Sequence, residues 1–374
     1  MTAYFDAAST TAVDPRILKT YEQVLAKYYV NSESLYPQGA EVAGLMEQSR
    51  GQAAALLGVQ PQELTFTSGG SEANNLAVKG TALACRSRGR HIITSRIEHS
   101  SVYNSCRWLQ EYAGCEITYL KVGPQGRIDT DQLAAAIRPD TILVTVMMVN
   151  NESGAIQPLT RVKEIVRRHP GLALHVDCVQ AIGKMPIDLT GIDMASFSAH
   201  KIHGLKGSGL LFHRAGHPLV PIISGGQQEN GLRGGTADAP ADMMWGKTLR
   251  LALDGLDGRI ARMREYHDFL YDRLAAMDGI VVNSPADGSP AIVNFSCLNI
   301  TSQVMLNALA AKGFLVSAQS TCDSRDAKSR VMAEMFSDPR RLAGTIRLSL
   351  SDDLQKDDIG GIINAIGGIV EQYG

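Results

Sequence analysis

Lys201 lies in a segment whose residue types suit a covalent amine catalyst. It follows the apolar run Asp193–Ser198 and has Ser198 and His200 as close neighbours. A lysine that attacks a carbonyl must be partly desolvated and have neighbours that lower its proton affinity. Most lysines are solvated surface groups, but the pattern Ser-x-His-Lys-x-x-Gly-x-Lys-Gly favours a functional amine here. We interpret Lys206, the second lysine of this pattern, as structural.

Asp177 is a single carboxylate at the end of the hydrophobic run Leu172–Val176. Such a group can keep a pyridine nitrogen protonated, so that the ring accepts electrons, as the chemistry of pyridoxal phosphate (PLP) requires. The alternative is a carboxylate that only caps the following turn. Gln180, three residues on, could donate to a ring oxygen or be solvated. Together with Lys201, Asp177 makes PLP the expected cofactor.

The segment Thr67–Asn75 runs from a strand through Gly69 and Gly70 into a helix. Glycines let the backbone approach an anion closely, and a helix start offers unpaired N–H groups, so the segment could bind a phosphate. Ser71 suits the N-cap of that helix. An ordinary capped turn explains the same residues equally well. The segment lacks the glycine patterns of dinucleotide-binding and NTPase loops, which disfavours both.

His99 follows another strand-like run and opens a helical stretch. A neutral imidazole in this place could stack on a pyridine ring and move protons. A polar residue that only starts a helix is the alternative.

Strands that alternate with helices must position these side chains. Short β-rich runs separated by helical patterns imply βα units and a mostly parallel sheet. The strand-like runs are Leu64–Thr67, His91–Thr94, Ile117–Leu120, Ile142–Val149, Leu172–Val176, Asp193–Ser198 and Gly209–His213. Functional residue types follow four of these runs directly. Because ligands of open α/β sheets bind beyond the carboxyl ends of the strands, we expect one shared site there.

The length of 374 residues exceeds one ordinary hydrophobic core and predicts two domains. We expect an N-terminal arm at 1–14, a large PLP-binding domain at 15–251 and a small α+β domain at 252–374. A long helical stretch from about Ala239 to Met277 would carry the boundary near Leu251. The small domain would contain strands near Ile280–Val282, Ala291–Ser296, Phe314–Ser317 and Thr345–Ser349, and a closing helix from about Lys356.

Charge and cysteine content narrow the function classes. A formal charge of -2 provides no basic field, so nucleic acid is not an expected partner. The N-terminal residues lack a signal-peptide pattern, and no apolar stretch is long enough for a bilayer, so no membrane partner is expected. Six cysteines without a paired C-x-x-C motif favour free thiols in a reducing cytoplasm. We expect no metal site.

Four motifs in this order and spacing resemble one known superfamily. They are Phe66–Asn75, Val149–Gly154, His175–Asp177 with Gln180, and Ser198–Lys201. The chain resembles the class V aminotransferases among the fold-type I PLP enzymes, and within them the cysteine desulfurases of the NifS/IscS type. The likeness extends from Tyr4 to Ser349. It implies an α/β fold with a mostly parallel seven-stranded sheet between helices in the large domain, and a smaller α+β C-terminal domain.

The resemblance implies a role for each matching residue. Lys201 would hold the cofactor as a Schiff base, Asp177 would pair with the ring nitrogen, His99 would stack on the ring, and Gln180 would contact its hydroxyl group. Four residues would bind the phosphate: Gly70, Ser71, Ser198 and His200. Thr236 would reach the phosphate of the partner subunit, which implies a homodimer. Three residues would bind the substrate: Asn31, Arg347 and Asn151, and Asn151 would also contact the cofactor.

The segment Val316–Ser324 resembles the mobile loop of this family, at about residues 318–332, with Cys322 as the nucleophile. Polar residues around it favour an exposed, flexible segment. The resemblance implies that L-cysteine becomes L-alanine, that Lys201 removes the Cα proton, and that Cys322 takes the sulfur as a persulfide. An acceptor protein of iron–sulfur cluster assembly or tRNA thiolation would then receive it. Gln319-Ser320-Thr321 replaces the Gly-Ser-Ala run that usually precedes the cysteine.

Two alternatives to this function remain open. The first is an aminotransferase, or a lyase of the selenocysteine type, that acts on another amino acid. The second is a degenerate homologue without catalytic activity.

Overall fold

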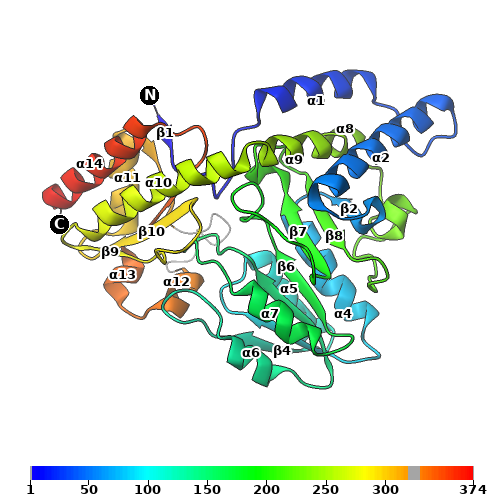
Figure 1. Ribbon diagram of the computed structural model, residues 1–374, viewed down its shortest axis with the longest axis horizontal. Helices are drawn as coiled ribbons and strands as arrows, with labels where there is room; N and C mark the ends of the chain where they lie inside the picture. The colour runs from blue at the N-terminus through cyan, green and yellow to red at the C-terminus, as the bar shows by residue number, and fades with distance from the viewer. Residues whose placement is uncertain (1, 319–328, 374) are drawn as a thin grey trace.

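The structure is a computed structural model that describes residues 2–318 and 329–373. Cys322 and most of the loop expected around it lie outside the described residues. The described chain forms two groups of elements, each built around its own sheet (Figure 1).

A seven-stranded sheet forms the centre of the larger group. In spatial order its strands are β2 (Leu64–Thr67), β8 (Gly209–His213), β7 (Met194–Ser198), β6 (Ala173–Asp177), β5 (Thr141–Met147), β3 (His91–Ser95) and β4 (Glu116–Leu120). β8 is antiparallel to its neighbours β2 and β7, whereas the other neighbours in this sheet pair in parallel. The expected mostly parallel, seven-stranded sheet is confirmed.

Helices cover both faces of this sheet, because side chains along a strand alternate between the two faces. Ile92 and Leu143 share an apolar cluster with α3 (Gly70–Asn75) and α5 (Ser100–Tyr112). Ile93 and Val144, their neighbours in sequence, belong to the opposite cluster with α7 (Leu159–Arg167) and α9 (Trp245–Leu253). Strands β3 and β5, which are rich in β-branched residues, are buried along their whole length because helices cover both faces of the sheet.

The larger group contains five further helices. They are α1 (Pro15–Lys27), α2 (Pro37–Leu57), α4 (Thr81–Ala84), α6 (Thr130–Ala136) and α8 (Ala239–Asp242). α3 continues through a π-helical turn at Leu76–Gly80 into α4, so that helical geometry runs from residue 70 to residue 84. The connection between α1 and α2 projects from the rest of the molecule (Figure 1).

The smaller group is built by the C-terminal part of the chain. Its antiparallel sheet has the order β12 (Thr345–Ser349), β10 (Ile292–Cys297) and β9 (Ile280–Val282). One apolar cluster joins this sheet to α10 (Leu256–Ala275), α11 (Ser302–Ala311) and α14 (Lys356–Tyr373). Two short helices, α12 (Arg330–Met335) and α13 (Pro339–Ala343), complete the group.

The N-terminal arm is anchored to the smaller group. Its strand β1 (Ala3–Tyr4) pairs in parallel with β11 (Phe314–Leu315), and Phe5 is buried in the same cluster as the small sheet. Asp14 caps α1 through its side chain, so the arm ends where the helix begins.

The prediction of one long helical stretch from Ala239 to Met277 is wrong. The structure has three helices there, and the main break separates α9, which ends at Leu253, from α10, which begins at Leu256. Gly255 in this break has φ of +64°, a left-handed conformation that interrupts an α-helix. The strand expected at Phe314–Ser317 is also shorter, since β11 covers two residues. The domain boundary between residues 251 and 252 remains a prediction.

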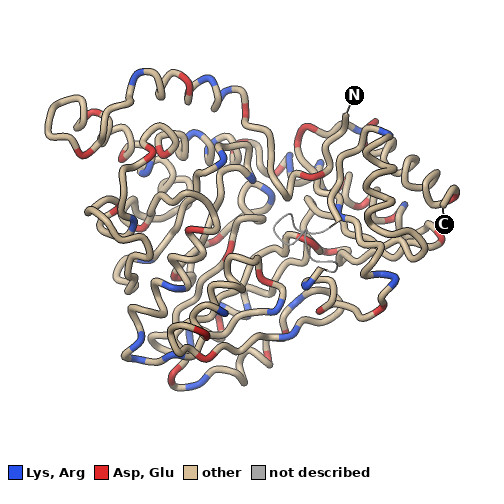
Figure 2. Tube along the Cα trace, turned by 180° about the vertical axis from the view of Figure 1, so that it is seen from behind, with Lys and Arg blue, Asp and Glu red and all other residues tan. Residues whose placement is uncertain are grey.

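Positively and negatively charged residues are interspersed along the chain (Figure 2), in keeping with the formal charge of -2. Within the described ranges, no helix combines the length and the apolar character that a bilayer span requires. The same ranges hold no group of three His, Cys, Asp or Glu side chains placed to bind a metal ion.

Candidate active site

A cavity of about 560 Å³ lies where the carboxyl ends of the large-sheet strands meet the N-terminal arm and β12. Segments that follow β2, β3, β5, β6 and β7 contribute to its wall. Ten residues expected at the site line it: Gly70, Ser71, His99, Asn151, Asp177, Gln180, Ser198, His200, Lys201 and Arg347. The sheet edge therefore brings these side chains together, as the order of strands and polar residues predicts.

Three expected site residues are not among those that line this cavity. Asn31 and Thr236 are exposed, and Cys322 lies outside the described residues. The Asn31 side chain accepts a 3.0 Å hydrogen bond from the Glu33 backbone N–H, in the connection between α1 and α2. Within one chain, Asn31 and Thr236 thus stand apart from the other expected site residues.

Lys201 ends a 3-10 turn, Ala199–Lys201, that directly follows β7. Its side chain is half-buried, and Nζ donates to the backbone oxygens of Ala8 and Ser9, each at 2.6 Å. The buried strand positions the lysine backbone, and two carbonyl groups of the arm hold its amine at the cavity wall.

Asp177 ends β6 and is 5% exposed. One carboxylate oxygen accepts from Asn74 Nδ2 at 2.7 Å, and the other accepts from the Val179 backbone N–H at 3.0 Å. Asp177 therefore caps the turn that follows β6 and is also a buried hydrogen-bond acceptor at the cavity wall.

The glycine turn packs tightly against the strands beside it. Gly69 is the N-cap of α3 and has φ of +149°, a conformation that favours glycine. A Cβ at Gly70 would lie 2.8 Å from Cγ2 of Val179 and 3.4 Å from Cβ of Ser198. The expectation that Ser71 is the N-cap is wrong, because helical geometry begins one residue earlier, at Gly70.

His99 is the N-cap of α5, and its Nδ1 accepts from the Ser101 backbone N–H at 3.2 Å. The nitrogen that accepts carries no proton, so a neutral His99 ring has its proton on Nε2. The helix-start role considered from the sequence is confirmed. The residue also lines the cavity, where its stacking on a ring remains a prediction.

His200 contacts the arm through Nδ1 and the Thr10 hydroxyl oxygen, which are 3.1 Å apart. Burial and the positive charges of Lys201, Lys206 and Lys184 lower the pKa of His200 to about 4. The ring is therefore neutral near pH 7.

Arg347 on β12 is 1% exposed. Its terminal nitrogens donate to Asn151 O at 2.8 Å, to Asp6 Oδ1 at 2.7 Å and to Ser9 Oγ at 2.8 Å. Nε is buried and has no hydrogen-bond partner among the described residues. The guanidinium group thus links the N-terminal arm to the sheet edge by hydrogen bonds, and its Nε–H is a donor without a partner among the described residues.

Several residues at the site were not anticipated from the sequence. Asn74 binds Asp177, the backbone oxygens of Ala8 and Ser9 bind Lys201, and Lys206 lines the cavity although we expected it to be structural. Asn74 follows Gly70 by four residues, a spacing that places both on one helix face and could have indicated it. No sequence pattern indicates that the backbone oxygens of Ala8 and Ser9 bind Lys201. Cys178, beside Asp177, is fully buried in the core cluster of the large sheet.

Comparison with known proteins identifies the family. The aminotransferase class-V family model matches residues 3–361. The NifS/IcsS protein homolog of Lactobacillus delbrueckii subsp. bulgaricus is 39% identical, over 99% of this chain and 97% of that protein. Cysteine desulfurase IscS of Dictyoglomus turgidum is 35% identical, over 99% of this chain and 94% of that protein.

Solved structures agree with this match. A NifS-like protein superposes with a TM-score of 0.93 at 34% identity and covers 100% of both chains. SspA in complex with cysteine superposes with a TM-score of 0.81 at 31% identity, over 93% of this chain and 99% of that one. The expected fold class is confirmed, and the chain belongs to the class-V aminotransferase family.

Proposed function

We propose that this protein is a PLP-dependent cysteine desulfurase, which converts L-cysteine to L-alanine. The observation that carries the proposal is the meeting of an amine (Lys201), a buried acid (Asp177) and a glycine-led helix start (Gly70) in one cavity. An amine can bind the aldehyde of PLP, an acid can pair with its pyridine nitrogen, and the N–H groups of a helix start can bind its phosphate. Relatives named cysteine desulfurase, such as one 35% identical over 99% of this chain, support the choice of reaction.

The residues present fit the cofactor. Lys201 would hold its aldehyde carbon, Asp177 would face its ring nitrogen, and four residues would bind its phosphate: Gly70, Ser71, Ser198 and His200. Asn74 Oδ1 is buried without a partner among the described residues, and the absence of a Cβ at Gly70 lets the turn lie against Val179, where a Cβ would come within 2.8 Å of Cγ2. When bound, PLP supplies an aldehyde that captures the substrate amine and a ring that stores electrons as a bond to Cα breaks.

Three further side chains would orient the ring. His99 would stack on it, Gln180 would donate to its hydroxyl oxygen, and Asn151 would contact it from the segment that follows β5. All three line the cavity.

The substrate carboxylate would bind Arg347, with Asn151 as a further contact. Asn31, which does not line the cavity of its own chain, remains a predicted contact. A guanidinium group matches a carboxylate in charge and in the direction of its N–H groups. The buried Nε–H of Arg347 has no partner among the described residues and would be a donor for that carboxylate.

Lys201 would take the proton from the substrate Cα, and the Cys322 thiolate would attack the substrate sulfur. The carbon–sulfur bond breaks, the sulfur remains on Cys322 as a persulfide, and alanine leaves. The other cysteines support this assignment: Cys85, Cys106, Cys115, Cys178 and Cys297 are buried free thiols. Burial raises the pKa of each of these thiols, which makes them poor nucleophiles.

Incubation of the purified holoenzyme with L-cysteine tests the proposal. We expect alanine as product and a mass gain of one sulfur on the peptide that contains Cys322. The Cys322→Ala variant should lose both and keep the absorbance of the bound cofactor, whereas Cys178→Ala should form the persulfide. Unchanged alanine production by Cys322→Ala would contradict the role of Cys322. If borohydride reduction leaves no pyridoxyl label on Lys201, the cofactor assignment is wrong.

A homodimer is part of the same proposal. Five apolar side chains on α1 and in the connection to α2 are exposed: Leu18 54%, Leu25 49%, Tyr29 81%, Leu35 104% and Tyr36 51%. Exposed apolar patches of this kind mark interaction surfaces. Thr236 is exposed on the same chain, as a residue that completes a partner's phosphate site must be.

The persulfide sulfur would pass to an acceptor protein, for iron–sulfur cluster assembly or tRNA thiolation. The free thiols of the described chain suit a reducing cytoplasm.

A further inference from the structure

Lys184 is a buried lysine in the turn that follows β6. It is 7% exposed, and its Nζ donates to Gln180 Oε1 at 2.8 Å. The charged groups that act on it are the cations Lys201 and Arg347. A buried ammonium group without a nearby acid costs free energy. Its presence beside the candidate active site therefore requires a compensating role.

The hydrogen bond from Lys184 determines which way the Gln180 amide points. An ammonium group only donates, so the Gln180 atom that it contacts must be the carbonyl oxygen. Gln180 Nε2 then faces the other way and donates to Ala8 O at 2.9 Å. Nε2 carries a second N–H, and Gln180 lines the cavity of the candidate active site. Lys184 thus makes Gln180 a donor toward that cavity.

The same backbone oxygen connects this arrangement to Lys201. Ala8 O accepts from Gln180 Nε2 and also from Lys201 Nζ, at 2.6 Å. Lys184 and Lys201 therefore lie at the two ends of one short hydrogen-bonded chain.

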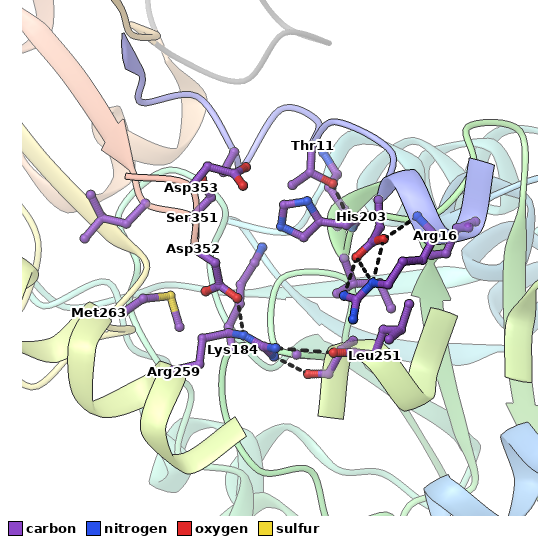
Figure 3. A pocket seen from close by; sticks show the side chains of 18 residues that line it. Thr11, Arg16, Lys184, His203, Leu251, Arg259, Met263, Ser351, Asp352 and Asp353 are labelled. Carbon is purple, nitrogen blue, oxygen red and sulfur yellow. Dashed lines mark hydrogen bonds and ion pairs between the residues drawn. The ribbon is translucent and has the colours of Figure 1, made fainter. Parts of the chain in front are cut away.

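Lys184 also lines a second cavity, of about 220 Å³ (Figure 3). Lys201 lines both this cavity and the candidate active site, so the two cavities adjoin there. The other cations of the second cavity's wall have acidic partners. Arg259 pairs with Asp352 (Figure 3), and Arg16 pairs with Asp14. Asp353 and His203 also line it. Lys184 differs from Arg259 and Arg16 because it is buried and because the charged groups that shift its pKa, Lys201 and Arg347, are both cations.

Two positive charges in one partly dry region disfavour each other. Burial and the charges of Lys201 and Arg347 lower the pKa of Lys184 to about 7. By the same repulsion, a charged Lys184 favours the neutral form of the Lys201 nitrogen, and a cationic neighbour is a known way to activate a Schiff-base lysine.

We infer that Lys184 is a positioning residue for the cofactor, which orients Gln180 toward the ring oxygen and favours the neutral Lys201 nitrogen by its charge. This rests on the proposed function, because the ring oxygen belongs to PLP. Two measurable consequences follow: one for the affinity of the cofactor, and one for the pH at which the Lys201 nitrogen gains its proton.

The Lys184→Met variant tests both consequences, because it removes the charge and keeps most of the length of the side chain. In the holoenzyme, we expect the midpoint of the pH titration of cofactor absorbance to rise by about one pH unit. We also expect the Kd for PLP to rise roughly tenfold, since the Gln180 amide is free to turn. Lys184→Arg, which keeps a positive charge, should restore most of the wild-type midpoint. Lys163→Met, at a surface lysine that pairs with Asp188, is the matched control and should change neither value.

A wild-type midpoint and Kd in Lys184→Met, with only the melting temperature changed, would overturn the inference. If Lys184→Met does not fold, the Lys184→Gln variant provides the test instead, because glutamine is neutral but can still form a hydrogen bond with Gln180. Its midpoint must rise in the same way, and an unchanged midpoint again overturns the inference. If the wild-type protein takes up no PLP, the proposed function fails instead.

Discussion

Asn74 Nδ2 donates a 2.7 Å hydrogen bond to Oδ2 of Asp177. Asn74 comes from the helix after β2 and is 1% exposed, whereas Asp177 ends β6. The bond joins two segments that are 103 residues apart in the chain. An amide outside the expected site residues thus orients the acid that is expected to bind the ring nitrogen.

We expect Asn74→Ala to weaken the binding of PLP about tenfold, because loss of one buried donor to a charged group costs roughly 1–3 kcal/mol. Titration of the apoprotein with PLP, followed by absorbance, measures the effect. Asn75→Ala is the matched control, since that amide donates to a backbone oxygen, Ser71 O. Equal affinities of Asn74→Ala and the wild-type protein would remove Asn74 from the site.

Gly70→Ala should reduce PLP affinity at least tenfold, because the added Cβ would lie 2.8 Å from Val179 Cγ2 and must displace the turn beside Asp177. Gly44→Ala on α2 is the matched control, since a Cβ there meets no atom within 4 Å. It should leave PLP affinity unchanged and stabilise the protein by about 0.5–1 kcal/mol, because alanine favours a helix. Equilibrium titration and urea unfolding give the two quantities. Normal PLP binding by Gly70→Ala would show that the turn has room to spare.

Glu98 makes stability depend on pH. Burial, with the negative charge of Asp177, raises the pKa of Glu98 from its ordinary value of 4.5 to about 8. Below pH 4.5 the folded and unfolded chains both hold the proton. Between pH 4.5 and about 8 the folded protein keeps a proton that the unfolded chain has lost. The free energy of unfolding therefore falls as pH rises, by at most about 1.4 kcal/mol per pH unit.

We expect Glu98→Gln, which resembles the protonated acid, to lose this dependence. Relative to the wild-type protein, the variant should gain roughly 2–3 kcal/mol between about pH 5.5 and pH 8, measured by urea unfolding at both values. Glu111→Gln on α5, at an exposed position, should gain nothing. A constant difference between Glu98→Gln and wild type across this range would mean that Glu98 titrates normally.

Leu35→Asp should dissociate the proposed homodimer. Leu35 is 104% exposed, so the substitution leaves the fold of one chain intact and places a charge on the apolar surface. We expect the dimer dissociation constant to rise at least tenfold, as measured by light scattering over a range of concentrations. Val304→Asp on α11, 43% exposed, is the control and should remain dimeric. A wild-type protein that is monomeric at all concentrations would contradict the dimer itself.

The sequence by itself determined which polar residues meet at the sheet edge. Asp177 and Lys201 each follow a buried strand directly, and parallel strands end at the same edge. The direction of the chain therefore brings together residues that share no sequence neighbourhood. Local apolar patterns were sufficient for this, because strand length and alternation depend on nearby residues.

The tertiary structure alone decided how those residues are held. Lys201 binds the carbonyl oxygen of Ala8, 193 residues away, and Arg347 pairs with Asp6, 341 residues away. Such pairs depend on how the arm and the two sheets pack, which no local pattern encodes. Lys184 follows Gln180 by four residues, a spacing visible in the sequence, but its burial among cations appears only in the folded chain. The types and order of the residues therefore specified which functional groups meet at the sheet edge, whereas long-range packing specified the hydrogen bonds that hold them.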